Sequence, residues 1–229
     1  MTTEEYRKKS PLRIFLHYFG NHKGLFALDI GCATLIYLDP GIVVCRKEPG
    51  MDSEKDVPEA LKGKLGGDIF PIHRLDKGVG GLMVYARTKP AAAFLSKAVT
   101  DGALEKEYLA LVHGCPPMDG TWQDLLWKDS RKNKVFVVKR PRAGVREAKL
   151  SYRVLIPGEE SLVRVHLYTG RSHQIRVQFA SRGYPLVGDH KYGSRSKAET
   201  LRLFSAGLKF PWQGKELSFS LEPDWGTGL

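Results

Sequence analysis

The sequence predicts an α+β fold with a central sheet that is mostly antiparallel or mixed and has few flanking helices. Short apolar or alternating runs, which are typical of strands, recur along the chain, and several are joined by tight turns. The 229 residues, 42% of them hydrophobic, suffice for a real core, and no repeat or long linker divides them. We therefore expect one domain over residues 1–229, in which residues 1–24 form a polar, basic segment of uncertain structure.

The first half of the chain supplies a hairpin and two helical segments. Two apolar runs flank Asp39-Pro40-Gly41, which indicates a strand, a turn and a strand. Residues 52–67 are polar and rich in Gly and Lys, which favours a helix that ends in a loop. Pro90 suits the first turn of a helix over residues 89–99, where apolar residues recur at helical spacing.

The second half alternates between apolar and polar residues more clearly. Ser172 is a plausible N-cap for a short helix over residues 173–180, which Gly183 ends. The strands that we predict, in chain order, cover residues 35–38, 42–45, 82–86, 108–112, 147–156, 162–169, 203–210 and 216–221.

Charge and cysteine content narrow the class of protein. The formal net charge of +11 favours a polyanionic partner, with nucleic acid as the first candidate. Cys32, Cys45 and Cys115 are odd in number and far apart, which argues against a disulfide framework or a zinc site and suits a reducing compartment. The N-terminus does not read as a signal peptide, and acidic residues interrupt the apolar stretch 24–45. We expect a cytoplasmic protein with no membrane span and no metal.

The segment from His73 to Gly81 is the first that could carry chemistry. It places Asp76 close to Arg74 and follows it with a glycine-rich turn. A carboxylate beside a guanidinium stays ionised and can act as a nucleophile or a base, whereas the glycines let a ligand approach the backbone. The same pattern, taken alone, also fits a surface ion pair at a tight turn.

The segment from Thr169 to Arg176 is the second. Two arginines, a histidine and a glutamine surround a predicted helix start, where backbone N–H groups and guanidinium groups suit phosphate or carboxylate oxygens. An ordinary capped helix with a basic face is the alternative. Tyr108, at the start of a predicted strand, would by itself indicate only packing.

Taken together, these segments resemble the RluA-type family of pseudouridine synthases. The family is marked by an HRLD motif, a K-x-Y-x-A-L strand, a T-G-R-x-H-Q-I-R motif and a P-x-x-G-D-x-x-Y-G loop. In this sequence the four motifs stand in that order and begin at His73, Lys106, Thr169 and Pro185. The resemblance spans roughly residues 34–225. It implies the catalytic fold of these enzymes, with loops around an RNA-binding cleft.

The resemblance also implies roles for individual residues. Asp76 matches the family's nucleophile, whose attack on the ribose or on the base stays open. Tyr108 matches the tyrosine that stacks on the target base and is placed to take a proton. Arg176 matches the cation that pairs with the catalytic carboxylate, and Arg74 matches the arginine that fills the gap left by the flipped base. Residues expected to contact RNA besides Arg74 are His73, Arg171, His173 and Lys47.

A uridine in stacked RNA hides its glycosidic bond, so such an enzyme must extrude the nucleotide at a cost of a few kcal/mol. The resemblance implies that this occurs in ribosomal or transfer RNA without a metal or cofactor. We expect a monomer that lacks an RNA-binding module of the S4 type.

Two positions depart from the family pattern. Val79, Gly80 and Gly81 stand where the family usually has Thr-Ser-Gly, so two hydroxyl groups are lost and the loop is expected to be more mobile. The family's N-K-P-x-G turn reads here Arg46 to Gly50, with the proline displaced by one. An RNA-binding protein of the same fold with impaired catalysis is therefore an alternative. Leu28 to Cys32 resembles the first motif of S-adenosylmethionine-dependent methyltransferases, but the further glycines and the strand–helix alternation are missing.

Overall fold

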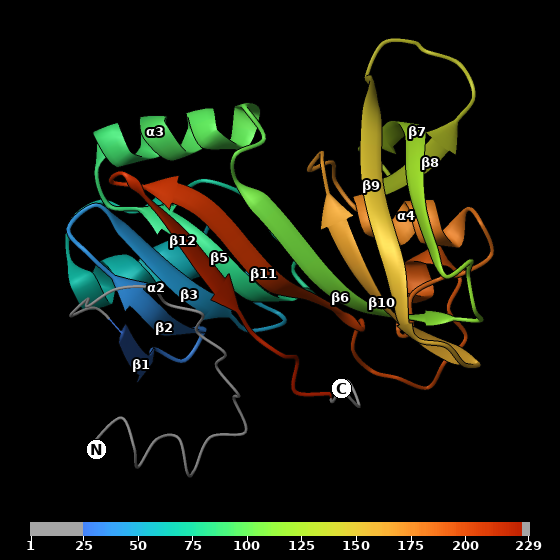
Figure 1. Ribbon diagram of the computed structural model, residues 1–229, viewed down its shortest axis with the longest axis horizontal. Helices are drawn as coiled ribbons and strands as arrows, with labels where there is room; N and C mark the ends of the chain where they lie inside the picture. Colours follow the sequence, from blue (N-terminus) through green and yellow to red (C-terminus); the bar gives the residue numbers. More distant parts are fainter. Residues whose placement is uncertain (1–24, 226–229) are drawn as a thin grey trace. The chain divides into compact units, whose positions relative to one another are not determined.

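The computed structural model describes residues 25–225, which form two compact units (Figure 1). The first unit runs to Lys106 and resumes at Ser205, and the second covers Glu107–Phe204. The sequence predicted one domain over residues 1–229. The segment 1–24, predicted as polar and of uncertain structure, lies outside the described residues.

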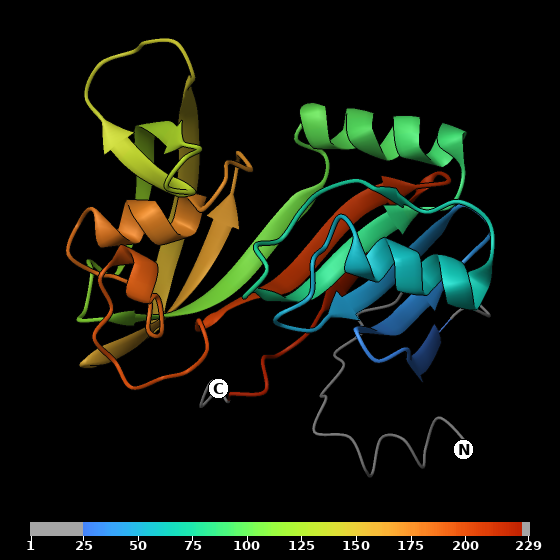
Figure 2. The ribbon, with the colours of Figure 1, turned by 180° about the vertical axis from the view of Figure 1, so that it is seen from behind.

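The first unit is a sheet with two helices packed on it (Figures 1 and 2). Its strands follow the order β1-β2-β3-β5-β11-β12, and the short β4 pairs with β5. Every strand pair with a described register is antiparallel. The elements are β1 (Leu25–Asp29), β2 (Ala33–Leu38), β3 (Ile42–Lys47), α2 (Asp56–Leu65), β4 (Phe70–Pro71), β5 (Gly80–Ala86), α3 (Lys89–Thr100), β11 (Leu203–Trp212) and β12 (Lys215–Ser220).

Local chemistry explains the turns and caps of the first unit. The carboxylate of Asp39 accepts the backbone N–H groups of Gly41 and Ile42, which closes the predicted hairpin turn between β2 and β3. The hydroxyl of Thr88 accepts the N–H of Ala91 and so caps α3. All residues of β3 and β5 are buried, so these two strands form the centre of this core.

The second unit is a sheet of order β6-β10-β9-β7-β8. Its helix α4 lies against the β7–β9 strands and is seen in front of them in Figure 2. Val177 of α4 packs with Leu126, Val135 and Ala148 of those strands. The elements are β6 (Glu105–His113), β7 (Asp119–Asp129), β8 (Lys134–Val138), β9 (Val145–Ile156), β10 (Glu160–Leu167), α4 (Gln174–Ala180) and the 3-10 helix η1 (His190–Tyr192).

The predicted class and all eight predicted strands are confirmed, as are the three helical segments, with shifted ends. Two differences have a clear cause. Strand β7 was not predicted, because Asp124 stands between Trp122 and Leu126 and breaks the apolar pattern; β1, β4 and β8 were not predicted either. The interior accepts this carboxylate since Arg182 donates two hydrogen bonds to it, of 2.9 and 3.1 Å.

The second difference concerns helix α4. Its N-cap residue is His173, in the left-handed conformation with φ 51°, and not Ser172. The segment Leu28–Cys32 does not lead into a helix either: it belongs to β1 and to its hairpin connection with β2. That placement removes the strand-turn-helix context which a methyltransferase motif needs.

Candidate active site

Asp76 lies in a turn of the first unit that connects β4 to β5. The backbone carbonyl of Asp76 accepts the N–H of Val79 at 2.9 Å, which closes the turn. The preceding Leu75 is buried and anchors the turn in the core, while Asp76 itself is half-buried. The carboxylate is thus carried by a short segment with both ends fixed.

Ser53 binds the residue before Asp76 through both of its backbone groups. The Ser53 hydroxyl accepts the N–H of Leu75 at 3.1 Å and donates to the Leu75 carbonyl at 3.0 Å. Ser53 is 2% exposed, and its own carbonyl accepts the hydroxyl of Tyr85 at 2.9 Å. Because water does not compete for these buried groups, the clamp fixes where the chain enters the Asp76 turn.

Lys47 and Gly50 bind the residue after Asp76. Both donate to the carbonyl of Lys77, Gly50 through its N–H at 2.7 Å and Lys47 through Nζ at 3.3 Å. Lys47 Nζ also donates to the carbonyls of Glu48 and Met51, each at 2.9 Å, so all three of its donors have acceptors. Its side chain is fully buried, and this burial lowers the pKa of Lys47 to about 8 although nearby carboxylates oppose the shift.

This geometry argues against the predicted contact of Lys47 with RNA. An ammonium group that is buried and fully bound to backbone carbonyls is not available to phosphate. Lys47 instead fixes the backbone on the far side of Asp76.

The segment from Val79 to Gly81, in which Val79 and Gly80 depart from the family pattern, is closely packed. A Cβ at Gly81, where φ is +117°, would lie 2.3 Å from the carbonyl oxygen of Ser205, so only glycine fits. A Cβ at Gly80 would lie 3.1 Å from Cδ of Pro49, which is the proline displaced by one. The two departures from the family pattern therefore meet at one contact. Val79 is buried.

His73 and Arg74 differ in exposure. His73 Nε2 accepts the N–H of Val84 at 3.2 Å, so its proton sits on Nδ1, which is buried and has no hydrogen-bond partner within the described residues. Burial, with a smaller effect of Lys106, lowers the pKa of His73 to about 3. This placement argues against the predicted RNA contact of His73. Arg74 is exposed and forms an ion pair with Glu54 at 3.2 Å, which leaves it at the surface as an RNA contact requires.

Arg176 lies on α4 in the second unit and is held by Asp189. Its Nε and Nη2 donate to the two carboxylate oxygens at 2.7 and 2.9 Å, a bidentate pair, and the Asp189 side chain is only 1% exposed. The guanidinium also lies 5.1 Å from the ring centre of Tyr192. These contacts fix the plane of the guanidinium on two sides.

His173 and Arg171 are fixed by neighbouring strands. Nδ1 of His173 lies 2.8 Å from the hydroxyl of Tyr192, which accepts the N–H of Val135 on β8. Arg171 is exposed, and its Nε donates to the carbonyl of Glu147 on β9 at 2.8 Å. The predicted binding motif, residues 169–176, is therefore held to strands β8 and β9 by contacts of both side chains.

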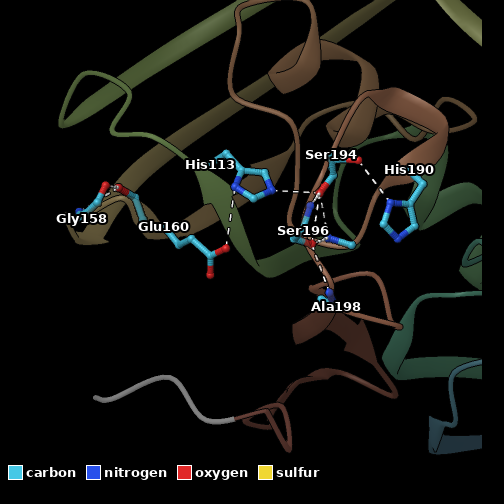
Figure 3. A network of polar contacts seen from close by, with 9 residues as sticks. His113, Gly158, Glu160, His190, Ser194, Ser196 and Ala198 are labelled. Carbon is cyan, nitrogen blue, oxygen red and sulfur yellow. Dashed lines mark hydrogen bonds and ion pairs between the residues drawn. The ribbon is translucent and has the colours of Figure 1, made fainter.

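The loop that carries Asp189 is held by a polar network (Figure 3). Nε2 of His113 lies 2.9 Å from Oγ of Ser194, which also accepts the N–H of Gly188 at 3.2 Å. The backbone N–H of Ser194 donates to the carbonyl of Asp189 at 3.0 Å, and Glu160 lies 3.7 Å from Nδ1 of His113. Because Ser194 is buried and already binds a backbone N–H, this acid–histidine–serine order holds the loop and offers no exposed nucleophile.

Tyr108 lies on β6 in the second unit, opposite Val165 of β10, and is 5% exposed. The predicted residues thus fall into two groups. The first unit holds Lys47, His73, Arg74 and Asp76, and the second holds Tyr108, Arg171, His173 and Arg176. Within the second unit, Tyr192 brings His173 and Arg176 together.

Sequence reasoning missed Ser53 and Asp189. Asp189 stood in a quoted motif without a role, and its motif position was the available signal. Ser53 had none, since it lies in a polar segment. Among the described residues, no group of three or more His, Cys, Asp or Glu side chains could hold a metal ion. No helix in the part of the chain that the structure describes is long and apolar enough to cross a membrane.

Comparisons with known proteins identify the family of this chain. The model of the RNA pseudouridylate synthase family matches residues 40–181. The ribosomal large subunit pseudouridine synthase D of Zymomonas mobilis is 31% identical over 82% of this chain and 68% of its own length. The dual-specificity RNA pseudouridine synthase RluA of Salmonella typhi is 31% identical over 84% of this chain and 94% of its own.

The chain spans 48% of the length of one curated relative that it matches and 94% of the length of another. The solved structure of human RNA pseudouridylate synthase domain containing 1 has the same fold. It has a TM-score of 0.74 at 21% identity and covers 87% of this chain and 86% of its own. The chain therefore belongs to the RNA pseudouridylate synthase family, of the RluA type.

Proposed function

We propose that this RNA pseudouridine synthase isomerises uridine in ribosomal or transfer RNA with Asp76 as its nucleophile. In the reaction the bond between uracil N1 and ribose C1′ breaks and the bond between C5 and C1′ forms. The C5 hydrogen leaves as a proton and N1 takes up a proton, so the composition of the nucleotide does not change.

One observation carries the role of Asp76: the backbone is fixed on both sides of it by buried groups. Ser53 binds Leu75 before it, and Lys47 and Gly50 bind Lys77 after it. A nucleophile must be held within a few tenths of an ångström of its reactive position, and a turn with fixed ends meets that need.

We assign the other two catalytic roles to the second unit. Arg176 supplies the cation that keeps the nucleophile charged when water is excluded, and its bidentate pair with Asp189 supports this role because it fixes the guanidinium. Tyr108 supplies the ring that receives the flipped base. Arg74, Arg171 and His173 contact the RNA.

The alternative of an impaired RNA-binding protein rests on the two hydroxyl groups that are missing at Val79 and Gly80. Asp76, Tyr108 and Arg176, which the catalytic role requires, are all present. The monomeric state, the cytoplasmic location and the absence of a metal or cofactor stay predictions. Unchanged activity after treatment with a chelator and dialysis is the expected result for the last of them.

Tritium release from RNA labelled at uracil C5 tests the proposal. The wild-type protein should release tritium from total ribosomal or transfer RNA, and Asp76→Asn should not, while its RNA affinity stays close to that of the wild type. Asp68→Asn, at an exposed carboxylate, is the matched control and should keep full activity. Release by the Asp76→Asn variant at a substantial rate would show that another group is the nucleophile.

A further inference from the structure

The positive charge of the chain is concentrated in one part of the second unit. Residues 128–149 contain nine Lys or Arg and two Asp or Glu, a net charge of +7, whereas the whole chain carries +11. Eight of the nine cations are exposed, and none of the nine makes an ion pair within the described residues. We call these residues the basic surface: Lys128, Arg131, Lys132, Lys134, Lys139, Arg140, Arg142, Arg146 and Lys149.

The strand register gathers these charges around one end of β7. Strands β8 and β9 pair with opposite edges of β7, at Phe136 and Val145 on either side of Trp127. The β8–β9 connection, residues 139–144, must therefore cross β7. The guanidinium carbon of Arg142, in this connection, lies 4.7 Å from the centre of the Trp127 ring. This connection stands out as the yellow loop above the second unit in Figure 1.

The β7–β8 turn has a defined shape that turns its cations outward. The carboxylate of Asp129 accepts the backbone N–H groups of Arg131 and Lys132 at 3.0 and 3.1 Å. Lys191 donates to the carbonyl of Asn133 at 3.1 Å and ties the turn to η1. The side chains of Arg131 and Lys132 are exposed. An ordered turn loses little entropy when its cations bind an anion.

The segment that carries the basic surface also contacts the predicted binding motif, residues 169–176. The N–H of Val135 donates to Tyr192, whose hydroxyl contacts His173, and Arg171 donates to the carbonyl of Glu147. Lys134 lies 5.3 Å from the centre of the Tyr192 ring. The basic surface and the motif that binds RNA in the proposed function are therefore contiguous within one unit.

We propose that the basic surface docks the phosphate backbone of the RNA that flanks the target uridine. This inference rests on the proposed function, because it takes RNA as the occupant. A uniform array of cations without acidic partners suits the repeating charge of a phosphodiester backbone. It holds the flanking RNA in place independently of the sequence while the target nucleotide is extruded. The site chemistry then acts on a substrate that is already aligned.

Two double charge reversals, Arg131→Glu/Lys132→Glu and Lys139→Glu/Arg140→Glu, test the proposal on exposed side chains. The matched control is Lys62→Glu/Lys64→Glu, which makes the same change of charge on exposed residues of α2 in the first unit. Arg142 is left intact because it packs on Trp127. The probe is a uridine-free RNA stem of G–C pairs closed by an adenosine loop, which reports docking without catalysis.

Each test variant should bind the probe at least about tenfold more weakly at low salt. The slope of log affinity against log salt should also become less steep by about 0.7 to 0.9 for each phosphate that the variant no longer binds. The control should keep the wild-type slope. With uridine-containing RNA that supports turnover, KM should rise in the test variants while kcat stays unchanged.

Wild-type affinity and slope in both test variants would overturn the proposal, and so would an equal loss in the control. A surface that serves an acidic protein or a membrane would give the first of these results. A failure of this docking proposal can be distinguished from a failure of the proposed function. Asp76→Asn tests the chemistry and leaves docking intact, whereas these variants test docking on an RNA that cannot react.

Discussion

Asp189 holds the guanidinium of Arg176 by two hydrogen bonds while the Asp189 side chain is almost completely buried. The loop of Asp189 is in turn fixed by Ser194 and His113 (Figure 3). The orientation of Arg176 thus depends on a residue thirteen positions further along the chain, in a separate sequence motif. Two separate sequence motifs therefore determine the orientation of one guanidinium group.

Replacing Asp189 with Asn should remove the negative charge of this pair and weaken the bidentate hold on the Arg176 guanidinium. Breaking a buried pair in this way typically costs about 3–5 kcal/mol. We expect a fall in the free energy of unfolding of this order and a lower kcat. Denaturant unfolding and tritium release measure the two effects. Asp101→Asn, in an exposed i,i+4 pair with Lys97, is the control and should change stability by less than about 1 kcal/mol. Equal losses in both variants would contradict the role of Asp189.

Ser53→Ala should loosen the entry to the Asp76 turn. It removes the hydroxyl that binds both backbone groups of Leu75 and leaves them buried without this partner, which costs about 1–3 kcal/mol. We expect kcat to fall while KM stays near the wild-type value, because the Ser53 side chain is buried and acts on the backbone of the turn. Ser53→Thr keeps the hydroxyl and should recover part of the rate. A change in KM alone would argue against positioning. Ser130→Ala, at an exposed serine, should have no effect on kcat.

Gly81→Ala and Gly63→Ala should act in opposite directions. The Cβ added at position 81 meets the backbone of Ser205 at a positive φ, so the strands must move apart and stability falls by several kcal/mol. Position 63 lies inside α2 and faces open space. There alanine should raise stability by about 0.5–1 kcal/mol. Thermal unfolding of both variants checks the pair, and a neutral Gly81→Ala would show that β5 and β11 can separate without cost.

Acid should destabilise the protein in part through His73. The pKa of His73 is about 3 in the folded protein, whereas the ordinary value for a solvated histidine is 6.5. Between these pH values the histidine is therefore protonated in the unfolded chain and neutral in the folded protein. The free energy of unfolding should therefore decrease as the pH falls from about 6.5 towards 3. His73→Gln keeps an acceptor near Nε2 but does not titrate, and should lose less stability over this window. Parallel curves for the two proteins would contradict the shifted pKa.

The sequence predicted the elements and the motif positions well because both depend on local patterns. The helix over residues 89–99 has a proline in its first turn and regular apolar spacing, and it appears as α3. The outcome for Lys47 could not be predicted, because its three acceptors lie on backbone atoms brought close by the tertiary fold. The left-handed His173 is similar: its conformation is supported by a contact with Tyr192, which lies 19 residues further on.

The contact between Gly80 and Pro49 links two substitutions that look independent in the sequence. A serine at position 80, as in the family pattern, would press its Cβ against the ring of Pro49. The two positions are therefore coupled, because a side chain at position 80 requires the ring of Pro49 to shift by a few tenths of an ångström. Grafting the family's serine alone should lower stability, whereas grafting it together with the family's placement of the proline should be tolerated. Transplants of the Asp76 turn between relatives should therefore exchange both positions.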